Sequence, residues 1–388
     1  MKRRLTVPVL CTCLCLAMLA GCGGSKIASY SGSDSAESSP TSSGGDLVTY
    51  DADTVVCTVD ESDITWEEYY YFLNSYYTTM ESYYGDITDW TAANAYDTSK
   101  TNNEEILNLA QPSMLESHVL LAQAEDKGLS VSDDAVDQQI ASNIDSAIGD
   151  GDGTLSDEEE TTFESYLSED SVSRTLYDTL MKESMTYTAL YNDYTANITD
   201  EDVLSWADGQ GYIAAKQILF PTVDLSSYDS DTSTYTALSD EEIAEAKTNA
   251  QNVYAQLQAV ADNPDTLATL FDNLMNEYSQ DTNLADYPDG YCFLPDNATE
   301  TYEQTAESLD ENYGLSDIVE SDEGYVIVLR FPPAPDMTMG YNSSSSTAFS
   351  LRDYCLSQEF NGQVDQWYAA AQIVWADGFE NLDLSTVF

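Results

Sequence analysis

The chain has 388 residues, and 70 acidic against 12 basic side chains give it a formal net charge of −58 at pH 7. This excess of negative charge excludes a nucleic-acid-binding protein, because contacts to phosphates need Lys and Arg. A hydrophobic content of 42% still supports a folded core, so the chain is not a disordered acidic protein. His118 is the one histidine, which excludes most hydrolase mechanisms.

The first 21 residues have the pattern of a signal peptide. A basic start precedes the apolar run 7–20, which is too short to span a membrane. Residues 19–22, Leu-Ala-Gly-Cys, resemble a bacterial lipobox, which implies a lipid on Cys22 and a protein anchored at the extracytoplasmic face of a bacterial cell membrane. Residues 22–50 are rich in Gly and Ser and predict a flexible tether.

Three cysteines remain beyond the predicted lipid site, namely Cys57, Cys292 and Cys355. They are too few and too scattered for a disulfide framework or a zinc site. We expect all three to be small buried hydrophobic residues.

Residues 51–208 predict a mostly helical segment after a short β-rich run at 55–59. Thr65-Trp-Glu-Glu68 has the form of a capping box that starts a helix. Helical spacing of apolar residues continues to the end of the segment, with many tyrosines in its first helix. The expected helices cover about 66–84, 115–127, a stretch from 133, 176–194 and a short stretch capped by Thr199.

Residues 210–333 alternate between strand and helix patterns and predict an α/β domain. The expected order is a strand at 213–220, a polar loop at 221–238, helices at 240–260 and 267–278, a helix at 302–309 and a strand at 324–329. Residues 336–388 form a third segment, in which 347–376 have helical spacing.

Two groups of motifs carry a resemblance to known families. Residues 120–133 and 198–203 resemble the N-terminal chaperone module of SurA- and PrsA-like foldases. Residues 212–220, Tyr278-Ser-Gln-Asp281, 289–293 and 324–330 resemble, in order, motifs of parvulin-type peptidyl-prolyl isomerases, and the resemblance implies a strand at 289–293. The resemblance implies an α+β fold: a mostly helical SurA-like chaperone module, completed by a C-terminal helix, with an inserted parvulin-like α/β domain.

The parvulin motifs depart from the family at both histidine positions, which hold Gln217 and Val326. The resemblance implies that Asp281 is the acidic residue near the substrate carbonyl and that Tyr302 helps to enclose proline. Asp289 and Ala298 replace apolar residues of the proline pocket.

We therefore take Asp281, Gln217 and Tyr302 as candidate catalytic residues, with isomerase activity weak or lost. Tyr291, Phe293 and Tyr302 are the candidate substrate-binding residues. An alternative for Asp281 is structural, since an Asp after Ser in a turn often accepts hydrogen bonds from nearby backbone amides.

An acidic segment, 150–159, has two interpretations. It resembles the later part of an EF-hand loop, in which Asp150, Asp152 and Glu159 would bind calcium, but Ile148 stands at the opening acidic position. We favour the alternative, in which Ser156 and Glu159 form a capping box. No cofactor is expected. His118 is interpreted as a structural residue and not as a ligand.

The combined interpretation is a membrane-anchored extracytoplasmic foldase whose partners are unfolded or partly folded secreted polypeptides. Adjacent tyrosines in the first helix cannot all face inward, so some are expected to be exposed and available to clients. The alternative function is that of a solute-binding or surface-adhesion lipoprotein without foldase activity.

Overall fold

The computed structural model describes residue 48 and residues 50–149, 155–169, 172–230, 232–295, 301–342 and 346–388. The predicted signal peptide, the lipid site Cys22 and the candidates Asp150, Asp152 and Ala298 lie outside these residues. Contacts divide the chain into a first unit, Met1–Ala196 with Phe360–Phe388, and a second unit, Asn197–Glu359. The second unit is therefore an insertion in the sequence of the first.

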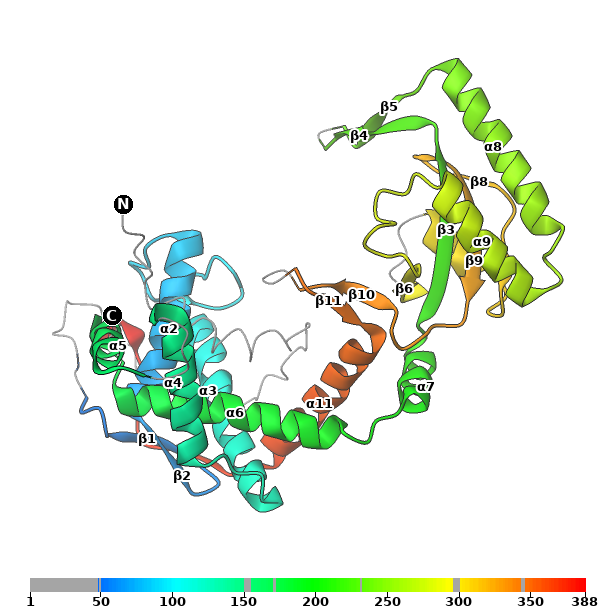
Figure 1. Cartoon of the computed structure of the whole chain (residues 1–388). Coiled ribbons are helices and arrows are strands. Elements are labelled where there is room, and N and C mark those ends of the chain that lie inside the picture. The colour runs from blue at the N-terminus through cyan, green and yellow to red at the C-terminus, as the bar shows by residue number, and fades with distance from the viewer. Residues whose placement is uncertain are drawn as a thin grey trace. The chain divides into compact units, whose positions relative to one another are not determined.

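The first unit is mostly helical (Figure 1). Its helices are α2 (Trp66–Tyr84), α3 (Asn102–Lys127), α4 (Asp133–Ile148), α5 (Asp157–Glu169) and α6 (Arg174–Thr195). A small antiparallel sheet of order β12-β1-β2 accompanies them, with β1 at Val55–Val59, β2 at Ser62–Thr65 and β12 at Ile373–Trp375. One core joins these elements and has Tyr69, Ile106 and Phe163 fully buried within it.

Most helix starts follow the local capping signals in the sequence. Ser132 caps α4, and α3 ends at Gly128 in the left-handed conformation that favours glycine. The capping box expected at Thr65 is only half formed. The Thr65 hydroxyl accepts from the Glu68 amide, but the Glu68 carboxylate is buried and bonds to His118 instead.

The C-terminal segment differs in part from its prediction. The expected helix at 347–376 is observed as α11, Leu351–Ala370, and the chain then forms β12. The sequence Ile-Val-Trp of β12 suits a strand, and it pairs with β1, placing Val59 opposite Ile373. The helix predicted beyond residue 370 was therefore wrong, because the partner strand β1 lies far away in the sequence and the local spacing does not indicate it.

The last half of α11 completes the first unit. Phe360 is fully buried with Leu120 of α3 and Leu190 of α6, and Val364 extends the same cluster. The predicted fold class, a helical module completed by a C-terminal helix with an inserted α/β domain, is therefore confirmed. The predicted domain limits stay predictions; contacts group α7 with the second unit and put the border between units within α11.

The second unit contains an antiparallel sheet of order β6-β3-β9-β7, with β8 also pairing with β9. These strands are β3 (Ile213–Pro221), β6 (Tyr291–Phe293), β7 (Gly314–Leu315), β8 (Val319–Glu320) and β9 (Gly324–Phe331). The helices are α7 (Asp200–Gln210), α8 (Asp240–Gln258), α9 (Pro264–Tyr278) and α10 (Thr301–Glu307). Figure 1 shows α8 and α9 packed against one face of β3 and β9.

Two hairpins were not expected. The predicted polar loop 221–238 contains β4 (Val223–Asp229) and β5 (Thr234–Ala237), and a second hairpin pairs β10 (Thr338–Tyr341) with β11 (Ala348–Ser350). All side chains of β4 and β5 are exposed or half-buried. A strand without a buried face lacks the alternation of apolar and polar residues that would reveal it in the sequence.

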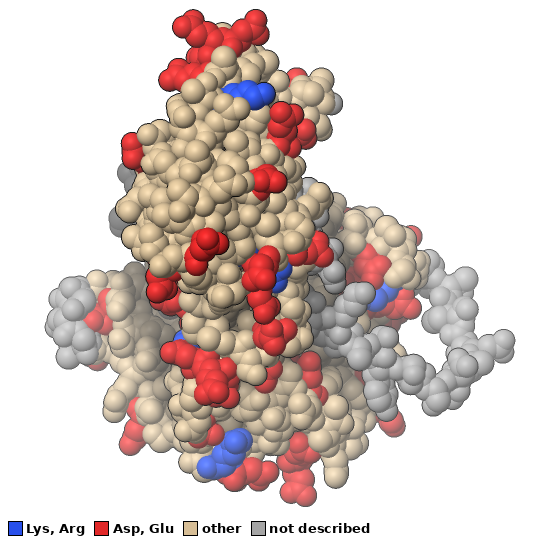
Figure 2. Space-filling model, turned by 90° about the vertical axis from the view of Figure 1, so that its right-hand side faces the viewer, with Lys and Arg blue, Asp and Glu red and all other residues tan. Residues whose placement is uncertain are grey.

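The three cysteines that the structure describes, Cys57, Cys292 and Cys355, are buried free thiols, as predicted. Burial raises the pKa of Cys57 and Cys355 to about 11 and that of Cys292 to about 12. Acidic side chains are spread over the face of the molecule drawn in Figure 2, with few basic ones between them. None of the helices in the described parts of the chain is long and apolar enough to cross a membrane.

Candidate functional site

The β3–β9 pair positions the candidate site on the sheet face away from α8 and α9. Side chains alternate between the two faces of a strand. Ile218 lies under the two helices, whereas Leu219 lies on the other face with Val326 and Val328. Gln217 is two residues from Leu219 and therefore shares this second face.

Asp281 is the centre of a hydrogen-bonded group on this face. The Gln217 side-chain amide donates to Asp281 Oδ2 over 2.9 Å, and the Tyr291 hydroxyl donates to the same oxygen over 2.6 Å. The backbone amide of Asn283 donates to Oδ1 over 2.9 Å. Both predicted roles of Asp281 are thus compatible with the geometry, because one oxygen stabilises its turn and the other faces two side chains.

The turn that carries Asp281 is fixed to β3. After α9 ends, the Ser279 hydroxyl accepts from the backbone amide of Leu219 over 3.1 Å. The backbone amide of Gln280 donates to the Leu219 carbonyl over 3.0 Å. These two bonds bring the Tyr-Ser-Gln-Asp motif beside Gln217, although 64 residues separate Gln217 from Asp281.

An aromatic row adjoins the hydrogen-bonded group. The ring of Tyr302 lies 5.3 Å from that of Tyr291 and 6.0 Å from that of Phe293. Tyr287 continues the row at 5.0 Å from Tyr291, and Tyr341 follows at 6.0 Å from Tyr287. The structure therefore brings together all five candidate residues, which are Gln217, Asp281, Tyr291, Phe293 and Tyr302.

Tyr287 and Tyr341 were not predicted from the sequence. Tyr287 lies in the sequence Tyr-Pro-Asp-Gly just before β6. Its position next to the strand motif could have identified it as a candidate substrate-binding residue. Tyr341 belongs to β10, and its hydroxyl donates to the Asp286 carbonyl over 2.8 Å. Nothing in the local sequence of Tyr341 indicates that contact, because the two residues are 55 positions apart.

Tyr291 is held as a neutral phenol. Burial, followed by its hydrogen bond to the Asp281 carboxylate and the charge of that group, raises the pKa of Tyr291 far above its ordinary value. At neutral pH the hydroxyl consequently remains a hydrogen-bond donor to Asp281. The two donors to Asp281 Oδ2, the Gln217 amide and the Tyr291 hydroxyl, are uncharged. The hydrogen bonds among these three side chains therefore involve no Lys or Arg.

Val326, at the second position where the parvulin motif has a histidine, is a buried apolar side chain. Val326 is 2% exposed, lies opposite Leu219 in the sheet register and packs in a cluster with Ala306 of α10. Valine offers no hydrogen bond, so the polar network ends at Gln217. Asp289, which stands at a position expected to be apolar, is exposed.

The described part of the acidic segment 150–159 forms a helix cap. Glu159 Oε2 accepts from the backbone amide and hydroxyl of Ser156, both over 2.8 Å, at the start of α5. The Ser156 hydroxyl in turn accepts from the Glu159 amide over 3.3 Å. The Glu159 carboxylate thus takes part in the capping box that the sequence analysis favoured.

Two family models match the chain and show to which families its domains belong. The SurA-like N-terminal domain matches residues 35–191, and the PPIC-type peptidyl-prolyl isomerase domain matches residues 231–331. The chain combines a SurA-like and a PPIC-type domain. The match to the PPIC-type domain includes Asp281, Tyr291 and Tyr302, whereas Gln217 on β3 precedes it.

Solved structures with some likeness to the chain include two PrsA proteins. PrsA from Bacillus subtilis is 18% identical with a TM-score of 0.24, covering 82% of this chain and 91% of that one. The peptidylprolyl isomerase PrsA from Bacillus cereus is 16% identical with a TM-score of 0.28, covering 86% and 98%.

A structure of two related SurA-like chaperones, PEB4 and Cj1289 of Campylobacter jejuni, is 12% identical with a TM-score of 0.26, covering 83% and 99%. No curated protein sequence matches the chain. Because these TM-scores are low, the assignment depends on the two family models.

Proposed function

We propose that the protein is a membrane-anchored extracytoplasmic foldase that holds unfolded secreted polypeptides and has a PPIC-type domain of weak isomerase activity. The observation that carries this proposal is the Gln217–Asp281–Tyr291 group beside the aromatic row, in which Asp281 and Tyr291 belong to the PPIC-type match and Gln217 lies on the adjoining strand β3. The printed descriptions of the similar structures as foldase, isomerase and SurA-like chaperone agree with it.

The chemistry of the site favours binding over rapid isomerisation. Rotation about an X–Pro bond faces a barrier of ~18–20 kcal/mol, which an enzyme lowers by binding the twisted form better than the planar ones. Here Asp281 Oδ2 already accepts from Gln217 and Tyr291, and Val326 adds no donor. The group therefore presents few free donors to a substrate carbonyl, while the rings of Tyr302 and Phe293 retain an apolar contact surface.

The first prediction concerns isomerisation by residues 47–388. We expect weak cis/trans isomerisation of proline tetrapeptides and a loss of about tenfold in Asp281→Ala, which corresponds to one lost hydrogen-bonded group. Asp286→Ala, an exposed nearby carboxylate, is the control and should retain the activity. Strong activity that survives in Asp281→Ala would contradict the proposed site.

The second prediction concerns client holding. Tyr83 and Tyr84 at the end of α2 are 78% and 52% exposed, and the nearby Tyr96 is 64% exposed. Exposed tyrosines can contact unfolded segments without strict sequence requirements. We expect residues 47–388 to suppress aggregation of a reduced model client, and the double variant Tyr83→Ala/Tyr84→Ala to do so at least about twofold less well.

Tyr228→Ala is the matched control, because Tyr228 is an exposed tyrosine of the second unit at 54% exposure. If both variants suppress aggregation equally well, Tyr83 and Tyr84 do not hold clients. If the parent protein does not suppress aggregation at all, the chaperone function itself is rejected. The solute-binding alternative is disfavoured, since the first unit is helical and not an α/β lobe.

The third prediction concerns the anchor. Lipidation of Cys22 would supply a diacyl group, which holds a protein at a membrane more stably than a single chain. We expect the full chain to fractionate with bacterial membranes and Cys22→Ala to leave them. Retention of Cys22→Ala on the membrane after a high-salt wash would argue against a lipid anchor.

A further inference from the structure

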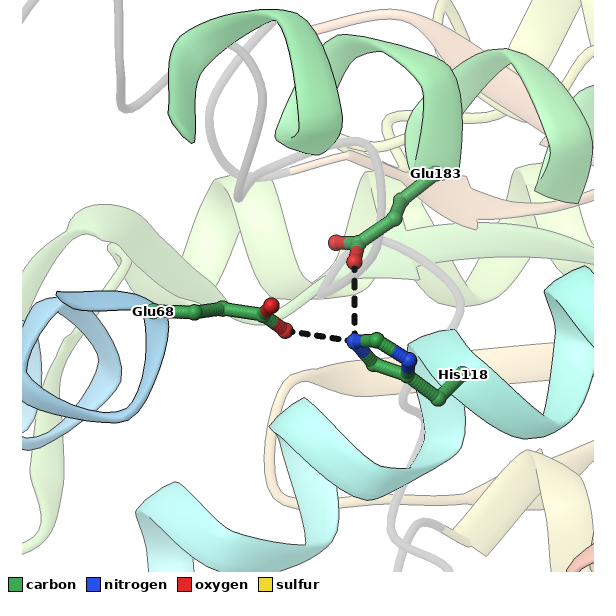
Figure 3. A group of neighbouring side chains, drawn as sticks. All are labelled: Glu68, His118 and Glu183. Atoms are coloured by element: carbon green, nitrogen blue, oxygen red, sulfur yellow. Dashed lines mark hydrogen bonds and ion pairs between the residues drawn. The ribbon is translucent and has the colours of Figure 1, made fainter. Parts of the chain in front are cut away.

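A cluster of three buried ionisable side chains lies inside the helical first unit, outside the PPIC-type domain. Glu68 of α2, His118 of α3 and Glu183 of α6 point toward one another in Figure 3. Their exposures are 4%, 4% and 2%. His118 Nε2 lies 2.8 Å from Glu68 Oε1 and 3.7 Å from Glu183 Oε1.

Glu183 lacks the partners that a buried carboxylate needs. Among the described residues, neither of its oxygens has a hydrogen-bond partner of ordinary length, and the same holds for the buried hydroxyl of Thr186. The Ser117 side chain does favour the charged form of Glu183, but the cost of burial outweighs this effect. Thr186 is three residues after Glu183, so both lie on one face of α6. Burying an unpaired polar group costs free energy, and a carboxylate costs more than a hydroxyl. The cluster therefore has unused ligating capacity directed inward.

His118 is oriented as a ligand would be. Its Nδ1 lies 3.0 Å from the hydroxyl of Ser62, on β2, and its Nε2 faces both carboxylates. A hydroxyl can accept as well as donate, so Ser62 can hold the tautomer with the proton on Nδ1. Metal-binding histidines have such a partner on the second nitrogen, which leaves the first nitrogen's lone pair for the ion.

We propose that Glu68, His118 and Glu183 form a binding site for a divalent transition-metal ion of the zinc class. The three ligating atoms lie within 4.8 Å of one another, so shifts of about 1 Å or less would allow bonds of ~2.0–2.2 Å to one ion. Two carboxylates and a neutral imidazole balance the charge of a divalent cation, so the buried site carries no net charge.

The ligand types exclude the alkaline-earth ions as the preferred occupants. Calcium takes six to eight oxygen ligands and magnesium favours six, mostly with several waters, whereas zinc is satisfied by three protein ligands and one further donor. An imidazole among the ligands also favours zinc, cobalt or iron over calcium and magnesium. Because the ligands come from three helices, the ion would fasten α2, α3 and α6 together.

The test uses residues 47–388 without a histidine tag, stripped of metal with a chelator, and titrates Zn²⁺ and Co²⁺. We expect one ion per chain and, for Co²⁺, visible d–d bands without thiolate charge-transfer bands. Glu183→Gln should weaken binding by about 100-fold or more, since loss of a partner outside the ligand shell already costs 10–100-fold. Glu67→Gln is the matched control, because Glu67 neighbours Glu68 but bonds to the Ser173 amide.

A second measurement does not need a variant. His118 is the only histidine, so ¹⁵N-histidine labelling gives one imidazole whose Nε2 resonance should move on Zn²⁺ addition while Nδ1 remains protonated. Unsaturable binding that is equal in Glu183→Gln and Glu67→Gln, with an unchanged imidazole signal, would show adsorption to the acidic surface and overturn the proposal. Thiolate charge-transfer bands in the Co²⁺ spectrum would also overturn the proposal, because they would show that a cysteine binds the ion.

Discussion

Replacing Phe360 with alanine is expected to lower the free energy of unfolding of the helical first unit by about 3–5 kcal/mol, the usual cost of removing a buried phenyl ring. Phe360 is fully buried, and its ring packs edge-to-face on Tyr187 and Tyr191 at 5.2 and 5.4 Å. Leu120 and Leu190 complete its surroundings. The side chain thus joins the C-terminal helix α11 to α3 and α6.

Urea unfolding of residues 47–388 followed by tryptophan fluorescence measures this effect. Four of the five tryptophans, namely Trp66, Trp90, Trp367 and Trp375, belong to the first unit, so the signal reports mainly on that unit. Phe349→Ala is the control, because Phe349 lies on β11 in the second unit. An unchanged midpoint in Phe360→Ala would mean that the N-terminal helices are stable without the C-terminal segment.

The sequence could predict those parts of the fold that depend on local signals. Ser132, Thr199 and Ser239 are followed by helices that start where predicted, because a cap satisfies backbone amides only three residues away. The strand β12 could not be placed, since Ile373 pairs with Val59 at the other end of the chain. Such a pairing is decided by tertiary packing and not by the local pattern.

The candidate residues could be grouped from the sequence because the parvulin-like motifs occur in a known order. Spacing alone does not bring Gln217 to Asp281; the two bonds between Leu219 and the turn after α9 do so. The buried cluster was missed for a related reason. Thr65-x-x-Glu68 has the form of a capping box, so Glu68 was assigned to the helix start, although its carboxylate contacts His118, 50 residues away.

The helical first unit and the PPIC-type domain are expected to contribute unequally to the proposed foldase function. A PPIC-type site that is already internally hydrogen-bonded would contribute slow isomerisation, so most of the benefit to a client would come from holding it. The strong negative charge would act in the same direction, since it would attract basic segments of a client. Salt should therefore weaken the capture of basic clients more than that of neutral ones.

Replacing Glu116 of α3 with glutamine is expected to make the free energy of unfolding depend less on pH. Burial and the charge of Asp365 on α11 raise the pKa of Glu116 from 4.5 to about 7. In the unfolded chain the group ionises near its ordinary pKa. Between pH 4.5 and about 7 the folded state binds more protons than the unfolded state, so the free energy of unfolding falls as the pH rises. The stabilisation that the protonated Glu116 carboxyl contributes is therefore full below pH 4.5 and is lost as the pH rises to about 7.

The expected result is that Glu116→Gln becomes more stable relative to the parent protein as the pH rises, by about 2–3 kcal/mol between pH 5 and pH 8. Denaturant unfolding of both proteins across this range gives the difference directly, and the contributions of the other carboxylates cancel in it. Glu125→Gln, an exposed position on the same helix, should show a difference that does not change with pH. A flat difference for Glu116→Gln would mean that this carboxylate ionises freely in the folded protein, and that α3 and α11 approach each other less closely there than the half-buried position of Glu116 requires.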